Sequence, residues 1–188
     1  MPRVAAGGTP EQSGNPAIGY RRKDLPRRGR VQYMKAVLQR VSAAQVDISG
    51  ETVGKIGRGF LVLLGVAQGD TEEDLDRLLA KILRLRVFED GNGKMNRSVQ
   101  DVGGGLLVVS QFTLLANYRH GNRPDFLGAA APAEAERLYR LFLERAAETV
   151  PVQHGQFGAD MQVSLCNDGP VTIVMDSEVL KPGAGTSK

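Results

Sequence analysis

Two short segments place polar side chains and an unusual backbone where a plain strand or turn would not need them. The first is Ser110-Gln111-Phe112-Thr113-Leu114, which follows a run of Leu and Val. Hydroxyl and amide groups at the end of a buried strand cost free energy unless they find partners. Ser110, Gln111 and Thr113 therefore bind or orient another molecule, or they form the satisfied end of a strand.

The second segment is Asn167-Asp168-Gly169-Pro170-Val171-Thr172. A prolyl peptide bond can be cis, which only about 5–6% of such bonds are in folded proteins. A cis bond between Gly169 and Pro170 would be an unusual way to point two carbonyl groups outward. Taken alone, the segment favours a plain turn between two strands.

Most other chemistry has little support in this sequence. The two histidines, His120 and His154, are far apart, and no acidic residue stands at a ligand spacing from them, so we expect no metal site. The one cysteine, Cys166, excludes an intrachain disulfide, and it has no paired histidine for nucleophilic catalysis. The glycines do not stand at the positions that a phosphate-binding loop or a dinucleotide-binding motif requires. We therefore also expect no cofactor.

Charge is divided unevenly along the chain. Residues 1–33 hold seven basic and two acidic residues and four of the nine prolines, whereas residues 34–188 hold 17 basic and 19 acidic residues. We interpret residues 1–33 as a disordered leader. It is either a basic arm that strengthens RNA binding or a segment upstream of the working start at Met34. The slightly acidic remainder argues against general nucleic-acid binding, DNA included.

Length and composition fit one domain. The chain has 188 residues and a mass of 20.2 kDa. We therefore expect a single domain over residues 34–180 and a polar tail over residues 181–188. The longest apolar run covers residues 60–67, which is far short of the roughly 18 residues of a membrane span. The N-terminus lacks the apolar stretch of a signal peptide. We therefore expect a cytoplasmic protein that does not bind membranes.

Apolar patterns predict six strands and two helices. Strands are expected over residues 35–48, 52–56, 60–66 and 106–115, and over residues 159–166 and 171–175, which a turn at 167–170 would join. Thr71 and Asp74 form an approximate capping box for a helix that ends near Leu85. Pro132 suits the start of a second helix, which runs to about Thr149. Because helices and strands do not alternate regularly, the class is α+β with a barrel-like, largely antiparallel sheet.

Taken together, the two polar segments resemble the D-aminoacyl-tRNA deacylase family. Residues 110–114 match its first signature motif, and residues 167–172 match its second, the Gly-cisPro motif. Three further stretches fit in the same order, namely residues 34–42 (MKAVLQRVS), 121–124 (GNRP) and 158–161 (GADM). The resemblance covers residues 34–177 and leaves out the leader, which supports Met34 as the working start.

This resemblance implies an activity and a partner. The family hydrolyses the ester between a D-amino acid and the 3′-terminal adenosine of tRNA, and it clears glycine mischarged onto tRNA-Ala, which is a proofreading step of translation. A homodimer is implied, with the tRNA 3′ end as the partner. Gly169 and Pro170 of one subunit would reach into the pocket of the other, where their carbonyls exclude L side chains and admit D side chains and glycine. Arg40 would hold this segment in place.

The resemblance also implies how the ester is cleaved. Backbone N–H groups around Phe112 and Thr113 would form an oxyanion hole, and one such donor is worth about 10²–10³ in rate. Ser110 and Gln111 would orient substrate or backbone, and the 2′-OH of the tRNA would help to activate water. Phe112 packs near the terminal adenine or belongs to the core. Candidate substrate-binding residues are Asn167, Thr172 and Arg123.

Two alternatives to this reading remain. One is an esterase that uses Thr113 as a covalent nucleophile, although no partner base is apparent in the sequence. The other is a non-catalytic module that binds RNA ends.

Overall fold

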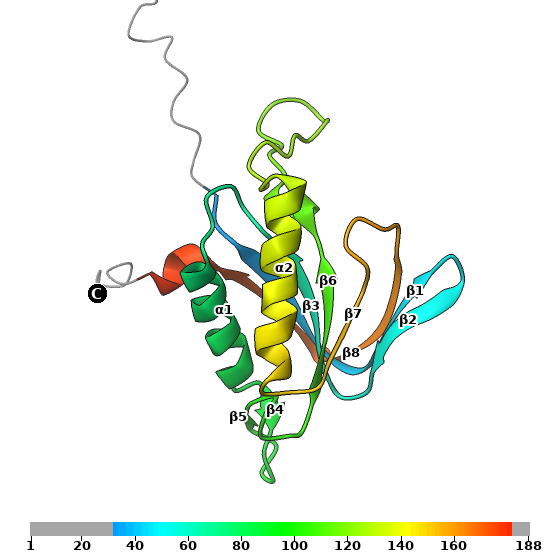
Figure 1. The fold of residues 1–188 in the computed structure, drawn as a ribbon. Helices are drawn as coiled ribbons and strands as arrows, with labels where there is room; N and C mark the ends of the chain where they lie inside the picture. Colours follow the sequence, from blue (N-terminus) through cyan, green and yellow to red (C-terminus); the bar gives the residue numbers. More distant parts are fainter. Residues whose placement is uncertain (1–31, 182–188) are drawn as a thin grey trace, which may run out of the picture. The chain divides into compact units, whose positions relative to one another are not determined.

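A long central strand organises the sheet. The computed structural model describes residues 32–181, so the predicted leader up to residue 31 and the tail after residue 181 lie outside the described residues (Figure 1). Strand β1 (Lys35–Ile48) pairs with three other strands. Its first half alternates between buried Ala36 and Leu38 and less buried neighbours. This is the period-two pattern of a strand that packs one face on a core.

Six strands form the main sheet, in the order β2-β1-β3-β6-β7, with β8 along the other side of β1. β1 is antiparallel to its three partners, whereas β3 is parallel to β6 and β6 is parallel to β7. The bounds are β2 (Glu51–Ile56), β3 (Gly59–Gly65), β6 (Gly105–Ser110), β7 (Val152–His154) and β8 (Gln162–Asp176). The α+β prediction is confirmed, and the sheet is mixed.

The sheet curls until its ends nearly meet. A Cβ on Gly54 of β2 would lie 2.8 Å from the carbonyl oxygen of His154 in β7, so these two strands touch. A small core fills the inside of the curl, and it consists of Val41, Ala44, Val46, Ile56, Leu61, Leu107 and Val109. The predicted barrel-like shape is therefore confirmed, and glycine permits the close approach that it requires.

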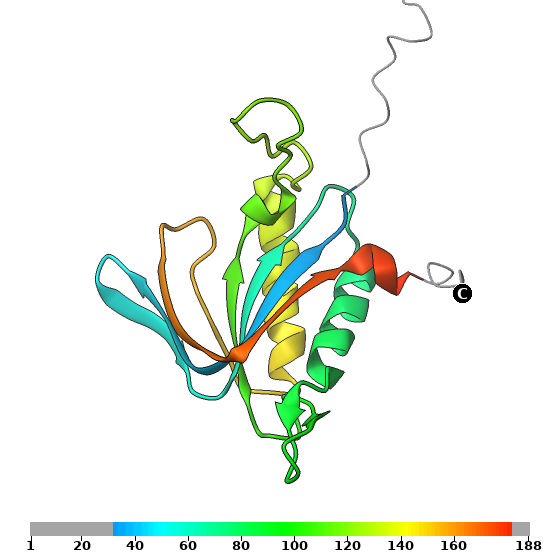
Figure 2. The same ribbon diagram turned by 180° about the vertical axis from the view of Figure 1, so that it is seen from behind.

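Two helices, α1 (Glu72–Arg84) and α2 (Pro132–Ala147), cover the outer face of the sheet (Figure 1). Thr71 and Asp74 form the predicted capping box, and Pro132 stands in the first turn of α2. The larger core lies between these helices and the strands. Seen from behind, the sheet faces the viewer with no helix in front of it (Figure 2).

The strand predicted over residues 106–115 is wrong after Ser110. The Gln111 N–H still donates to the Leu64 carbonyl at 2.7 Å, but β3 ends at Gly65. Residues beyond Gln111 then have no strand to pair with. They close into a 3₁₀ helix, η1 (Phe112–Leu115), through a bond from the Leu114 N–H to the Gln111 carbonyl at 3.2 Å.

The two C-terminal strands joined by a turn are also a wrong prediction. β8 runs from Gln162 to Asp176 without reversing, because both of its halves pair with β1 in the same direction. Two short strands, β5 (Met95–Arg97) and β7, were not predicted, since neither has a long apolar pattern. A third short strand, β4, covers Phe88–Glu89. A final 3₁₀ helix, η2 (Ser177–Leu180), ends the described chain.

Candidate active site

The second polar segment is a bulge in β8. Asn167 and Thr172 pair with the β1 residues on either side of Arg40, so residues 168–171 bulge out opposite Arg40. The Asn167 side chain ties the two ends of the bulge together. Its Oδ1 accepts from the Val171 N–H at 3.0 Å, and its Nδ2 donates to Thr172 Oγ1 at 3.0 Å. Asn167 and Thr172 therefore shape this segment.

The buried side chain of Arg40 binds the bulge. Its side chain is only 6% exposed, and Nε donates to the Asp168 carbonyl at 3.1 Å and lies 3.2 Å from Asp168 Oδ2. Nη1 donates to the carbonyl of Val87, which precedes β4. One guanidinium thus joins the bulge to a second segment of the chain. The rigid fork of Arg suits this task, because it donates in fixed directions.

The Gly169–Pro170 peptide bond is cis, and both residues are exposed. Gly169 has φ of +124°, and a Cβ there would lie 2.9 Å from Val171 Cγ2 and 3.0 Å from Arg40 Nη2. Only glycine adopts this backbone conformation and fits this space readily. The bulge is therefore both firmly held and open to an approaching molecule.

The first polar segment lies where β6 passes into η1. Ser110 and Gln111 are half-buried, whereas Phe112 and Thr113 are exposed. The first N–H groups of a helix have no partner inside that helix. The N–H groups of Phe112 and Thr113 occupy this position in η1. Ordered N–H donors at an exposed turn can bind an anionic oxygen.

Among residues 32–181, no general base contacts the Thr113 hydroxyl. The Gln111 side-chain amide donates to Thr113 Oγ1. An amide N–H is a donor and cannot remove the proton of a hydroxyl. This contact orients Thr113 and does not activate it as a nucleophile.

Phe112 does not belong to the core, so that alternative is wrong. The residue is 57% exposed and packs edge-to-face on Phe126, with ring centroids 4.9 Å apart. Phe126 comes from the long loop that precedes α2. Arg123 lies in the same loop and is exposed.

One chain does not bring the two segments together. Ser110 pairs with Leu64, which pairs with Ala36 on β1, whereas the bulge lies opposite Arg40. Ala36 and Arg40 are four positions apart on β1, which is roughly 13 Å along the strand. β3 and β1 also stand between β6 and β8. The two segments therefore lie too far apart to contact the same ester group within one chain.

An apolar row crosses the helix-free face between the two segments. Val37 pairs with Leu63 on one side and with Val174 on the other. The neighbours Ala36 and Leu38 point to the helix side, so alternation turns Val37 to the opposite face. Val174 is 74% exposed. Val37 and Leu63 are half-buried, so the row is exposed mainly at Val174.

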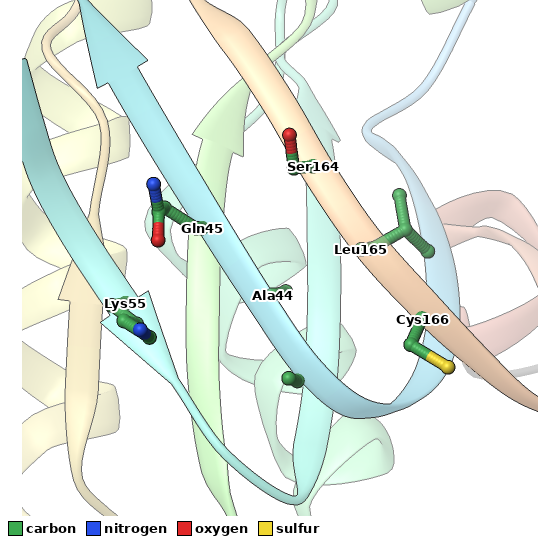
Figure 3. Close-up of a pocket in the computed structure, with 7 residues that line it drawn as sticks. Ala44, Gln45, Lys55, Ser164, Leu165 and Cys166 are labelled. Carbon is green, nitrogen blue, oxygen red and sulfur yellow. The ribbon is translucent and has the colours of Figure 1, made fainter.

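A shallow, open pocket of about 290 Å³ lies elsewhere, on β1, β2 and β8 (Figure 3). Its lining includes Gln45, Lys55 and Cys166 but none of the predicted site residues. Among residues 32–181, no three His, Cys, Asp or Glu side chains are placed to hold a metal ion. No helix in the same range is long and apolar enough to cross a membrane.

Sequence reasoning missed three contacts of the site. The Val87 carbonyl that accepts from Arg40 left no signal, because every residue has a carbonyl. The Asp168 carboxylate beside Arg40 was recognisable only as part of a motif. Phe126, the partner of Phe112, lies in a mostly polar loop that also holds Tyr118, so the sequence did not single it out.

The chain is similar to proteins of one known family. The family model described as D-Tyr-tRNA(Tyr) deacylase matches residues 37–176. The D-aminoacyl-tRNA deacylase of Variovorax paradoxus (strain S110) is 63% identical over 141 residues, which are 74% of this chain and 97% of that protein.

Two solved structures are also similar. One is described as the c-Myc DNA unwinding element binding protein; it is 47% identical, has a TM-score of 0.72, and the match covers 76% of this chain and 97% of that one. The other, a probable eukaryotic D-amino acid tRNA deacylase, has a TM-score of 0.67 at 18% identity, and the match covers 77% of this chain and all of that one. At this low identity, the similarity to the second structure shows a shared fold and nothing more.

The fold and the family match together show that this chain is an α+β protein that hydrolyses ester bonds. The chain belongs to the D-Tyr-tRNA(Tyr) deacylase family, as the resemblance of its two motifs implied.

Proposed function

We propose that this protein hydrolyses the ester of D-aminoacyl-tRNA in the cytoplasm, freeing the tRNA and the D-amino acid. The observation that carries the proposal is the bulge at residues 168–171, which Arg40 and Asn167 hold rigid while Gly169 and Pro170 stay exposed. The similarity to D-aminoacyl-tRNA deacylases over nearly their whole length supports the choice of substrate.

Selection for the D configuration works by exclusion. The carbonyls of Gly169 and Pro170 face the α-carbon of the substrate, so an L side chain collides with them and a D side chain points away. A rigid obstacle is required, because a mobile one would yield to the side chain. The contacts from Arg40 supply that rigidity. Glycine has no side chain to exclude, so glycine mischarged onto tRNA-Ala is also a substrate.

The active unit is a homodimer. The bulge and the turn at η1 are too far apart to act on one ester within a single chain. A second copy on the apolar row of Val37, Leu63 and Val174 covers that exposed surface. It also brings the bulge of each copy to the η1 turn of the other, so that two equal sites form across the interface.

Catalysis relies on backbone donors and on the RNA. When water attacks the ester carbonyl, negative charge develops on its oxygen, and the N–H groups of Phe112 and Thr113 stabilise that charge. The bond to the leaving 3′-oxygen then breaks, and this oxygen takes a proton. The neighbouring 2′-OH of the tRNA helps to activate the water. Ser110 and Gln111 position the turn, and Phe112 offers an exposed ring to the terminal adenine.

Thr113→Ala tests this mechanism, because it removes the hydroxyl and keeps the N–H. We expect release of D-Tyr from D-Tyr-tRNA to fall by less than about tenfold, with Thr149→Ala in the exposed turn after α2 as the matched control. A loss of several orders of magnitude would favour the Thr113 esterase. Tight tRNA binding without release in the unmodified protein would favour the non-catalytic module.

A further inference from the structure

A basic loop stands off the body beside the η1 turn. It runs from Asn117 to Asp125, which pair through backbone bonds of 2.8 and 2.9 Å and through Asn117 Nδ2 to Asp125 Oδ2 at 2.8 Å. Both ribbon views show it as a separate projection at one end of the molecule (Figures 1 and 2). Its base is fixed, because Leu127 N–H also donates to Asp125 Oδ1 at 3.2 Å.

The side chains along the basic loop are exposed and include two arginines. Arg119, His120 and Arg123 are all exposed. No described residue forms an ion pair with either Arg119 or Arg123. Four arginines on the helices differ, since Arg77, Arg137, Arg140 and Arg145 each pair with a carboxylate. The basic loop thus presents two uncompensated charges on a domain whose residues 34–188 are slightly acidic.

Aromatic rings accompany these charges. Tyr118 is 77% exposed, and Phe112 is 57% exposed at the foot of the basic loop, where Phe126 supports it. Exposed aromatic rings beside arginines are the usual surface for single-stranded RNA, because the rings stack on bases and the arginines bind phosphates.

We propose that the basic loop binds the unpaired 3′ end of the tRNA, with Arg119 and Arg123 on its phosphates and Tyr118 stacked on a base ahead of the terminal adenosine. This inference rests on the proposed function and adds the surface that receives the rest of the RNA end. Seven residues lie between the two ends of the basic loop, so its tip reaches at most roughly 13 Å from its base. That reach suits the nucleotides next to the ester and excludes the distant parts of the tRNA.

Binding of uncharged tRNA, followed by fluorescence anisotropy at several salt concentrations, tests the inference without requiring any catalysis. The test variant is the double substitution Arg119→Gln and Arg123→Gln. The matched control is Arg84→Gln with Arg140→Gln, which removes the same net charge from exposed positions on α1 and α2. A tRNA that lacks its unpaired 3′ nucleotides is the matched ligand.

We expect the test variant to bind intact tRNA roughly tenfold more weakly per arginine. We also expect it to reduce the slope of log K against log salt by about 1.4, which is 0.7 for each contact with a single strand. The control variant keeps both affinity and slope, and the truncated tRNA does not distinguish the two proteins. Equal affinity and slope for the test and control variants would overturn the inference.

The two proposals fail in different ways. Wild-type protein that binds the tRNA end through the basic loop but releases no D-amino acid would overturn the proposed function alone. Release of D-amino acid with unchanged binding by the test variant would overturn the basic-loop assignment alone. A duplex DNA competitor that displaces tRNA from the basic loop would also contradict the assignment, because the proposal depends on unpaired bases.

Discussion

Replacing Arg40 should weaken the fold and the rejection of L substrates together. Arg40→Met keeps the length of the side chain and removes its charge and its donors. The lost contacts are the bonds to the carbonyls of Asp168 and Val87. Each bond from a charged donor contributes about 1.5–3 kcal/mol, whereas the contact with the half-exposed Asp168 carboxylate adds less than about 1 kcal/mol.

Water can replace part of what is lost, because Asp168 is exposed. We therefore expect Arg40→Met to lower the free energy of unfolding by about 2–4 kcal/mol. In a domain of this size that is a fall in Tm of roughly 6–12 °C. The Tm of Arg40→Lys should lie between those of the wild type and Arg40→Met, since one ammonium group cannot reach both carbonyls.

The assay compares release of D-Tyr and L-Tyr from the same tRNA. With Arg40→Met, we expect the preference for the D ester to fall at least tenfold, mainly because the L ester is no longer excluded. Asp168→Asn is the control, since it removes the carboxylate and leaves the backbone carbonyl that accepts from Arg40. Full rejection of the L ester by a folded Arg40→Met protein would refute the reasoning that Arg40 keeps the bulge rigid.

Three further predictions concern other parts of the molecule. Gly169→Ala should cost about 1–3 kcal/mol of stability and admit L esters, because its φ is +124° and its Cβ would press on Val171 and Arg40; thermal unfolding and the D/L assay check this. Val174→Asp should convert a dimer into an inactive monomer in light scattering, whereas Val53→Asp, exposed on β2, should not. Burial raises the pKa of Asp70 to about 6 from 3.8, so the folded state binds more protons than the unfolded state between these pH values. Relative to Asp70→Asn, the wild-type free energy of unfolding should therefore fall by up to about 3 kcal/mol as the pH rises from 4 to 7; urea titrations that show no such trend would contradict it.

The sequence predicted those elements whose residues repeat with a clear period. Both helices and the strands at the centre of the sheet appeared where expected, because a buried stripe or alternation marks each of them. The capping box of α1 was readable from Thr71 and Asp74 alone. Local patterns suffice where local packing determines the structure.

Partners distant in sequence were not predictable in the same way. β6 ends at Ser110 because its neighbour β3 ends at Gly65. The types of residues 111–115 do not indicate where β3 ends, so the end of β6 could not be predicted from them. The bulge in β8 was interpreted as a reversal because Asn-Asp-Gly-Pro is typical of turns. It is held straight by pairing on both sides with β1, which is more than 120 residues earlier in the chain.

Site residues were found through motifs, and their contacts were not. Gly169 and Arg40 were named in advance, but only the structure places the Arg40 guanidinium 3.0 Å from where a Cβ of Gly169 would be. That separation explains why the motif needs glycine at this position.

Parallel deacylation of D-Tyr-tRNA, L-Tyr-tRNA and Gly-tRNA tests the central claim most directly. The account predicts rapid release from the D and glycyl esters and no release from the L ester above the rate in buffer. Equal release from the D and L esters would contradict the exclusion of L side chains by Gly169 and Pro170.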